Sequence, residues 1–302
     1  MKYFRLLEDN KKIRLLVQLD EETIVDLTSI HSDLTDIIQI VLTSNIYSTS
    51  ITKTTEKILN NKSYETYKIA DIINSCKDAK SNLKMLTPIS SPEIWAAGVT
   101  YKTSAMERRR ESDTPDVYSK VYSAKRPEIF LKSTADRCSN PFESIGIRKD
   151  SQWNVPEPEL AIVLYKGAIL GYTIGNDVSS RSIEGENPLY LPQAKIYDKS
   201  CSIGPCLVIT ESLAHPENLN IECTISREGN LVFQETTSTS LLTRSFEDLA
   251  SWLQLHNRVP EMTSLLTGTA IVPPPEFTLL QDDVVRITVD QIGTLENPVS
   301  EV

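Results

Sequence analysis

The chain has 302 residues, of which 40% are hydrophobic and 24% charged, a composition typical of a globular protein with a large core. There are 41 Asp and Glu residues against 31 Lys and Arg, and the net charge of −10 argues against nonspecific binding to nucleic acid or to an anionic membrane. No apolar run reaches the roughly 18 residues of a membrane span, and the N-terminus lacks a signal-peptide core. The five cysteines show no C-x-x-C spacing, so we expect a cytoplasmic protein with reduced thiols.

The pattern divides the chain into a small N-terminal domain, residues 1–87, and a larger domain, residues 88–302. The elements expected in the first part are strands at 13–17 and 23–27, a helix at 34–41, and a loosely ordered Ser/Thr/Lys-rich segment at 43–57. A linker follows at 86–92, where two prolines and small polar residues cluster.

Beyond residue 92, short apolar runs alternate with turn-forming residues, which is typical of a mainly β structure. The expected strands are 94–99, 127–132, 160–164, 169–174, 206–210, 219–227, 231–236 and 284–289. Helices are expected at 103–111 and at 245–255, where Ser245 can cap the first turn. The pattern therefore predicts an α+β fold, mainly β, with a small N-terminal α/β domain.

Three acids stand beside the apolar runs of two expected strands. Glu157 and Glu159 come just before 160–164, and Asp177 follows 169–174. Alternate residues of an extended strand point to one side, so Glu157 and Glu159 share a face, and the proline between them favours the extended form. No histidine occurs from position 32 to 214. Oxygen ligands without histidine indicate a hard cation, Mg²⁺ first, with Ca²⁺ or Mn²⁺ as alternatives. The competing interpretation is that each acid is an ordinary solvated surface residue.

Several motifs resemble, in the same order, those of the fumarylacetoacetate hydrolase superfamily over roughly positions 92 to 300. They are Gly98-x-x-Tyr101, Arg126-Pro127-Glu128-Ile129-Phe130-x-Lys132, Pro156-Glu157-Pro158-Glu159-Leu160, Gly171-Tyr172-Thr173-Ile174-x-Asn176-Asp177-Val178-Ser179, Thr267-Gly268-Thr269 and Ile292-Gly293-Thr294-Leu295-x-Asn297-Pro298-Val299. The number and order of these motifs make a chance match very improbable.

The resemblance implies a mixed β-roll catalytic domain behind the small N-terminal domain, assembled as a homodimer or as a dimer of dimers. It implies a small 2-keto or 2,4-diketo acid substrate that chelates the metal ion through carboxylate and keto oxygens. The positions that it assigns are metal ligands at Glu157, Glu159 and Asp177, an active-site lysine at Lys195, and substrate contacts at Thr269, Tyr101 and Arg181.

The chain departs from the hydrolase pattern at one important position. Hydrolases of the family carry Gly-x-Asn-Tyr-x-x-His-x-x-Glu, in which the histidine and the glutamate activate water. Here Glu107 is retained as a catalytic candidate, but Ser104 replaces the histidine. A serine hydroxyl is far too weak a base for this step at neutral pH.

The missing histidine, together with the segment 186–193, resembles the branch of the family that contains 2-keto-3-deoxy-D-arabinonate dehydratase. In that interpretation Lys195 and Glu128 form the acid/base pair, and their roles within the pair stay open. A magnesium-stabilised enolate forms when a base removes a C3 proton. The C4 hydroxyl then leaves as water, and the resulting enol tautomerises to 2,5-dioxopentanoate.

Two alternatives stay open. The first is a metal-dependent C–C hydrolase or decarboxylase of acylpyruvate-type or fumarylacetoacetate-type diketo acids, which would use Glu107 with another activator of water. The second is a catalytically silent protein that binds the metal ion and a keto acid without converting it. The best-supported expectation is the dehydratase, a lyase.

Overall fold

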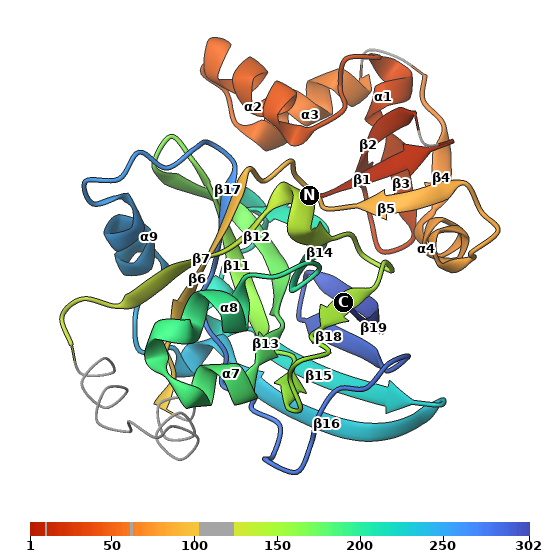
Figure 1. Ribbon diagram of the computed structural model, residues 1–302. Helices are drawn as coiled ribbons and strands as arrows, with labels where there is room; N and C mark the ends of the chain where they lie inside the picture. Colours follow the sequence, from red (N-terminus) through yellow and green to blue (C-terminus); the bar gives the residue numbers. More distant parts are fainter. Residues whose placement is uncertain (10, 61–62, 103–123) are drawn as a thin grey trace.

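The computed structural model describes residues 1–9, 11–60, 63–102 and 124–302 (Figure 1). In its N-terminal part the strands are β1 (Lys2–Glu8), β2 (Lys12–Gln18), β3 (Thr23–Asp26), β4 (Thr66–Lys68) and β5 (Leu83–Leu86). The helices of this part are α1 (Leu27–Ile30), α2 (Ile37–Ile46), α3 (Ile51–Asn60) and α4 (Ile69–Lys77). Helices α2 and α3 lie side by side at one end of the molecule, on the far side of the N-terminal strands from α4 (Figure 1).

The rest of the chain is mainly β, as predicted. Its strands are β6 (Glu93–Gly98), β7 (Glu128–Thr134), β8 (Cys138–Ser139), β9 (Ile145–Ile147), β10 (Asn154–Val155), β11 (Pro158–Tyr165), β12 (Ala168–Asp177), β13 (Ser179–Ser180), β14 (Cys201–Ile209), β15 (Asn220–Arg227), β16 (Asn230–Ser238), β17 (Thr263–Leu266), β18 (Val284–Val289) and β19 (Gly293–Glu301). The helices are α7 (Arg181–Glu186), α8 (Leu191–Lys195) and α9 (Phe246–Gln254). The eight strands expected beyond residue 92 are all present, and Ser245 caps α9 by accepting a hydrogen bond from the amide of Asp248. The helix expected at 103–111 falls outside the described residues.

Two large mixed sheets organise the molecule. The larger has twelve strands, with the order β4-β3-β2-β1-β14-β12-β11-β17-β6-β7 and with β5 and β8 paired beside that path. The smaller has the order β16-β15-β18-β19-β9. Most neighbours are antiparallel, whereas β6 with β17, β8 with β14 and β9 with β19 are parallel. Strand β1 pairs with β14 through two residue pairs, so the larger sheet runs from the N-terminal strands into the rest of the chain.

Strand β11 is apolar at successive positions because both of its faces are buried in the core. Leu160, Ile162 and Leu164 on one face of the strand join the core cluster that includes residues of the smaller sheet. Ala161 and Val163 on the other face join the cluster under the N-terminal helices. A strand that is covered on both faces needs apolar residues at successive positions. Acids at the end of such a strand are therefore already enclosed by the fold.

The prediction of loose order at 43–57 is wrong, because α2 and α3 occupy most of that segment. The hydroxyls of Ser44, Thr54 and Thr55 donate to carbonyl oxygens one turn earlier in the chain, and all three side chains are buried. Serine and threonine usually compete with the helical backbone. Here the hydroxyls of Ser44 and Thr54 lie 2.9 Å apart between the two helices, and the hydroxyl of Thr55 lies 2.7 Å from that of Tyr3 on β1.

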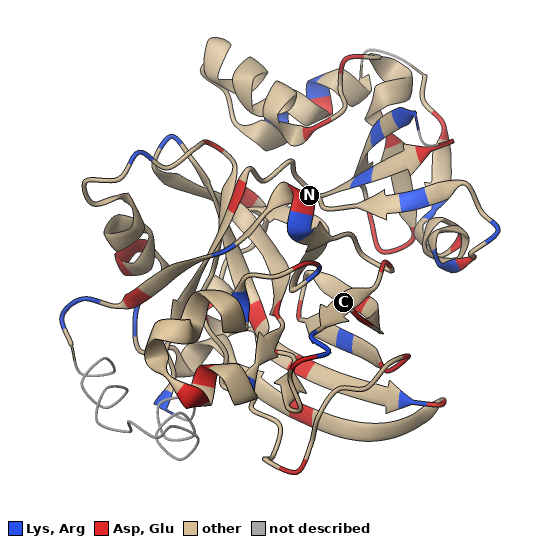
Figure 2. Cartoon of the chain, in the orientation of Figure 1, with Lys and Arg blue, Asp and Glu red and all other residues tan. Residues whose placement is uncertain are grey.

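Charges are distributed in both signs over the described chain (Figure 2). Within these residues, no helix has the length and apolar character that crossing a membrane requires.

Candidate metal centre

Three carboxylates meet where β11 and β12 end. Glu157 directly precedes β11, Glu159 lies on it, and Asp177 is the last residue of β12. One carboxylate oxygen from each lies within 4.8 Å of those of the other two. The antiparallel ladder sets this geometry, because Pro158 is paired with Asn176 and the amide of Asp177 donates to the carbonyl oxygen of Glu157 at 3.0 Å. All three side chains are buried.

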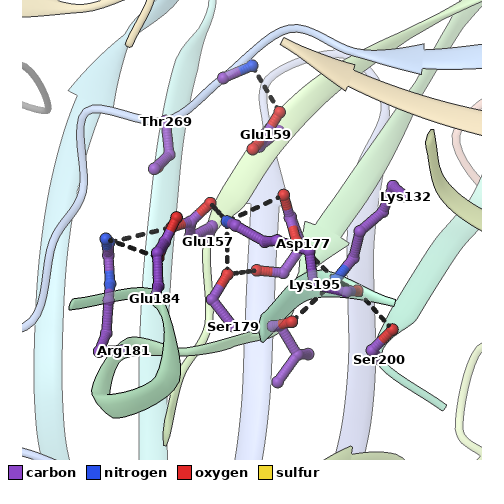
Figure 3. A network of polar contacts seen from close by, with 12 residues as sticks. Lys132, Glu157, Glu159, Asp177, Ser179, Arg181, Glu184, Lys195, Ser200 and Thr269 are labelled. Carbon is purple, nitrogen blue, oxygen red and sulfur yellow. Dashed lines mark hydrogen bonds and ion pairs between the residues drawn. The ribbon is translucent and has the colours of Figure 1, made fainter. Parts of the chain in front are cut away.

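Each carboxylate has one oxygen held by a different donor group. The guanidinium of Arg181 lies 2.9 Å from Glu157 Oε1, and the ammonium of Lys132 lies 2.6 Å from Asp177 Oδ1. The main-chain amide of Gly268 donates to Glu159 Oε2 (Figure 3). The donors come from α7, β7 and the loop after β17, so three separate parts of the chain fix the three acids.

Lys195, at the end of α8, contacts two of the acids through their other oxygens. Its Nζ lies 2.6 Å from Glu157 Oε2 and 3.2 Å from Asp177 Oδ2, and it donates to Ser179 Oγ at 2.6 Å (Figure 3). The side chain is only 1% exposed. Its ammonium also lies 5.7 Å from the ring centre of Phe130. The two inner oxygens and this lysine therefore share one small space.

The electrostatics of the cluster favour a bound cation. Burial raises the pKa of Glu159 well above its usual value of 4.5, and the charges of Asp177 and Glu157 raise it further. The Gly268 amide and Lys195 oppose this shift without cancelling it. A cluster of buried oxygen donors, with one carboxylate whose ionisation is unfavourable in the metal-free protein, fits a hard divalent ion such as Mg²⁺.

A cavity opens beside the acids. Its walls are formed by residues in or beside β6, β7, β11, β12, α7, α8 and the loop after β17, namely Ala97, Gly98, Val99, Glu128, Phe130, Glu157, Glu159, Asp177, Arg181, Glu184, Lys195, Gly268 and Thr269.

Two glycines make this cavity possible. A Cβ at Gly98 would lie 2.1 Å from Glu128 Oε2. Gly268 has φ +97°, and a Cβ there would lie 1.9 Å from Thr100 Oγ1. The backbone at Gly268 therefore requires glycine, and a side chain at position 98 would displace Glu128 from the site.

Most of the predicted site residues line this cavity. Besides the three acids, it brings together Lys195, Glu128, Arg181 and Thr269. Tyr101 is buried but is not among the lining residues, and burial, with a smaller effect of the Glu159 charge, raises its pKa. Glu107 and Ser104 fall outside the described residues.

The sequence interpretation missed two contributors. Glu184 lines the cavity and lies 3.5 Å from the Arg181 guanidinium. Lys132 holds Asp177, although it stands in a strand that was expected from its apolar residues. Its position two residues after Phe130 and four after Glu128, on the same face of the expected strand, could have placed Lys132 near the site.

Comparison with known proteins agrees with this geometry. Residues 93–300 match the family model of the fumarylacetoacetate (FAA) hydrolase C-terminal domain. The "Probable 2-keto-3-deoxyxylonate dehydratase" of Haloferax volcanii is 46% identical over 289 residues, which are 96% of this chain and 96% of that protein. The 2-dehydro-3-deoxy-D-arabinonate dehydratase of Saccharolobus solfataricus is 44% identical over 227 residues, 73% of this chain and 76% of that protein.

A solved structure is also similar over the whole length. The 2-keto-3-deoxy-D-arabinonate dehydratase complexed with magnesium and 2,5-dioxopentanoate has a TM-score of 0.81 and 36% sequence identity. The match covers 100% of this chain and 99% of that one. The mainly β fold with its mixed sheets is therefore the fold of these dehydratases.

Proposed function

Because the chain belongs to the fumarylacetoacetate hydrolase family, we propose that it is a magnesium-dependent hydro-lyase of sugar acids. Its substrate is a 2-keto-3-deoxy acid of the 2-keto-3-deoxy-D-arabinonate type, and its product is 2,5-dioxopentanoate. The similar dehydratases, and the structure that contains magnesium and this product, support the assignment.

The observation that carries the choice of dehydration over hydrolysis is the position of the histidines. The chain has three, His31, His215 and His256, and all are exposed and outside the cavity. Activation of water for C–C hydrolysis would need a base near neutral pH in the cavity, and histidine is the usual one. Dehydration needs proton transfer but no water nucleophile, so a lysine and a carboxylate can suffice.

The three buried acids are the proposed ligands of the metal ion. Glu157, Glu159 and Asp177 would hold Mg²⁺, which would supply a Lewis acid for the carboxylate and 2-keto oxygens of the substrate. Their buried oxygens and the raised pKa of Glu159 support this role.

Lys195 and Glu128 are proposed as the acid/base pair. Both line the cavity, one beside the acids and the other on β7. One member removes a proton from C3 and the other protonates the C4 hydroxyl, which leaves as water. Transfer of a proton from C5 to C3 then gives an enol at C4–C5, and its tautomerisation gives the C5 aldehyde. The net change is the loss of one water, as 2,5-dioxopentanoate requires.

Substrate contacts are proposed at Thr269, Arg181 and Tyr101. Thr269 and Arg181 line the cavity, which supports their assignment. Tyr101 and the catalytic candidate Glu107 rest on the resemblance of the sequence motif.

The test is product analysis after incubation with Mg²⁺ and 2-keto-3-deoxy-D-arabinonate, with an acylpyruvate in parallel. We expect 2,5-dioxopentanoate from the sugar acid, and none after chelation of the metal or in Glu157→Gln. Cleavage of the acylpyruvate with an untouched sugar acid would instead establish the hydrolase. Binding of keto acids with no turnover of either substrate would establish the silent binding protein.

We further propose a homodimer in the cytoplasm, with a dimer of dimers as the larger alternative. Five free cysteines support a reducing compartment. Exposed apolar side chains such as Ile46, Tyr47 and Leu189 support burial against a second copy. Light scattering coupled to size-exclusion chromatography measures the assembly directly, and a monomer at micromolar concentration would contradict it.

A further inference from the structure

We propose that Lys132 is a positioning residue that restricts Asp177 to one metal-facing oxygen, and that it thereby sets the preference of the site for magnesium over calcium. This role rests on the proposed metal-dependent function and concerns the selectivity of that site. Lys132 does not line the cavity, so it would act through Asp177 and not on the substrate.

The Lys132 ammonium has a fixed place. It lies 2.6 Å from Asp177 Oδ1, and it donates to the carbonyl oxygens of Val178, at 2.8 Å, and Lys195. Two of the three ammonium donors are thereby used on main-chain carbonyl oxygens, and the contact with Asp177 Oδ1 is an ion pair. Because two of the acceptors are main-chain atoms, the backbone sets the position of Nζ whatever rotamer Asp177 adopts. The side chain is 0% exposed, so water does not compete for these contacts.

The two lysines contact different oxygens of the Asp177 carboxylate. Lys132 contacts Oδ1, and Lys195 contacts Oδ2, which is the oxygen on the side of Glu157 (Figure 3). For Asp177 to bind a metal ion with both oxygens, Oδ1 would have to leave a charged partner that is itself anchored to the backbone. Loss of a buried charge's partner is strongly unfavourable.

In each of the other two acids, one oxygen also contacts a donor of the protein. Arg181 holds Glu157 Oε1 but also faces Glu184, and the donor to Glu159 Oε2 is an uncharged amide. A single oxygen ligand from each acid suits Mg²⁺, which takes six ligands in near-ideal octahedral geometry and keeps several positions for water and substrate. Ca²⁺ takes six to eight oxygens and readily accepts two from one carboxylate. Releasing Asp177 Oδ1 should therefore favour calcium.

The experiment is calorimetric titration of the metal-free protein with Mg²⁺ and with Ca²⁺, in wild type, Lys132→Met and Lys132→Gln. Removing a positive charge beside the acids strengthens binding of both ions, so the readout is the ratio Kd(Ca²⁺)/Kd(Mg²⁺). We expect this ratio to fall at least tenfold in Lys132→Met. Lys132→Gln keeps a shorter amide donor for the buried carbonyl oxygens, which protects the fold, and it should show the same direction.

Arg5, which is distant from Lys132 in the sequence and does not line the cavity, provides a matched control. It is also a buried cation that contacts one carboxylate, Asp36 at 3.3 Å, and two main-chain oxygens, those of Thr35 and Thr87. Arg5→Met should lose stability as Lys132→Met does, and it should leave the ratio unchanged.

The outcomes separate the two proposals. An unchanged ratio in folded Lys132 variants, or an equal shift in Arg5→Met, overturns the role of Lys132. Wild-type protein that binds neither ion overturns the metal centre and the role of Lys132 together. Wild-type protein that binds Mg²⁺ but dehydrates no sugar acid overturns the proposed reaction alone, and the ratio still decides the role of Lys132.

Discussion

The amide of Asp177 donates a 3.0 Å hydrogen bond to the carbonyl oxygen of Glu157, so the backbone itself joins two of the three acids. The bond continues the β11–β12 ladder one step beyond the Pro158–Asn176 pair. The separation of these two carboxylates is therefore a property of the sheet, and it requires no metal ion to be established. A preformed cluster of this kind should bind its cation with little change of backbone structure.

Replacement of Glu157 tests the cluster most directly. Glu157→Gln removes one anionic ligand, so Arg181 loses its charged contact at 2.9 Å and keeps Glu184, and Lys195 loses its charged contact at 2.6 Å and keeps Asp177. Breaking a buried ion pair costs about 3–5 kcal/mol, so we expect a clear loss of stability. We also expect at least tenfold weaker Mg²⁺ binding and no detectable product. Calorimetry and thermal unfolding measure these effects, with Glu217→Gln, an exposed glutamate, as the control that should behave as wild type.

The raised pKa of Glu159 predicts a pH-dependent stability of the metal-free protein. Between the usual value of 4.5 and the higher folded-state pKa, the folded protein binds more protons than the unfolded one. Stability must therefore fall as pH rises through that window. Glu159→Gln carries no such proton, so its stability relative to wild type should increase from pH 5 to pH 8. Urea unfolding in the presence of a chelator measures this, and parallel pH curves for the two proteins would contradict it.

Replacement of Lys195 should separate chemistry from metal binding. Lys195→Met removes an acid/base group, which typically contributes about 10²–10⁴-fold to the rate, and we expect kcat to fall within that range. Its ammonium occupies Glu157 Oε2 and Asp177 Oδ2, so Mg²⁺ binding should be unchanged or tighter. Initial rates and calorimetry give the two values. A variant with wild-type kcat would remove Lys195 from the mechanism.

The contact between Gly98 and Glu128 allows a double-mutant cycle. In Gly98→Ala, the new Cβ would lie 2.1 Å from Glu128 Oε2 and must displace that side chain. We expect kcat to fall about tenfold or more in Gly98→Ala, and further in Glu128→Ala. If the glycine acts through Glu128, adding Gly98→Ala to Glu128→Ala should have little further effect on kcat. Additive losses would show that Gly98 is needed for another reason.

The strands and the acids could be read from the sequence because their signals are local. The apolar run after Glu159 marks β11, and the E-x-E spacing places two carboxylates at its start. The helical segment α3 was not predicted because its threonines are unfavourable in an isolated helix, whereas in the folded chain Thr54 and Thr55 are buried. Tertiary packing makes this segment helical, and the local sequence pattern carries no information about that packing.

The surroundings of the acids were less predictable. Lys132 on β7 contacts Asp177 from 45 positions away, and Gly268 after β17 contacts Glu159 from 109 positions away, so only the folded chain brings these donors to the acids. The motif resemblance supplied Lys195, Arg181 and Thr269, which local pattern alone does not join to the acids. The division into residues 1–87 and 88–302 stays a prediction.

The pairing of β1 with β14 has a practical consequence for attempts to isolate the catalytic part. β14 lies between β1 and β12, the strand that carries Asp177. A fragment that begins at residue 88 would expose the main-chain groups of Leu207 and Val208, which now face Tyr3 and Lys2. An uncovered strand edge recruits other chains. Such a fragment should aggregate unless a polar or charged residue on β14 protects the new edge.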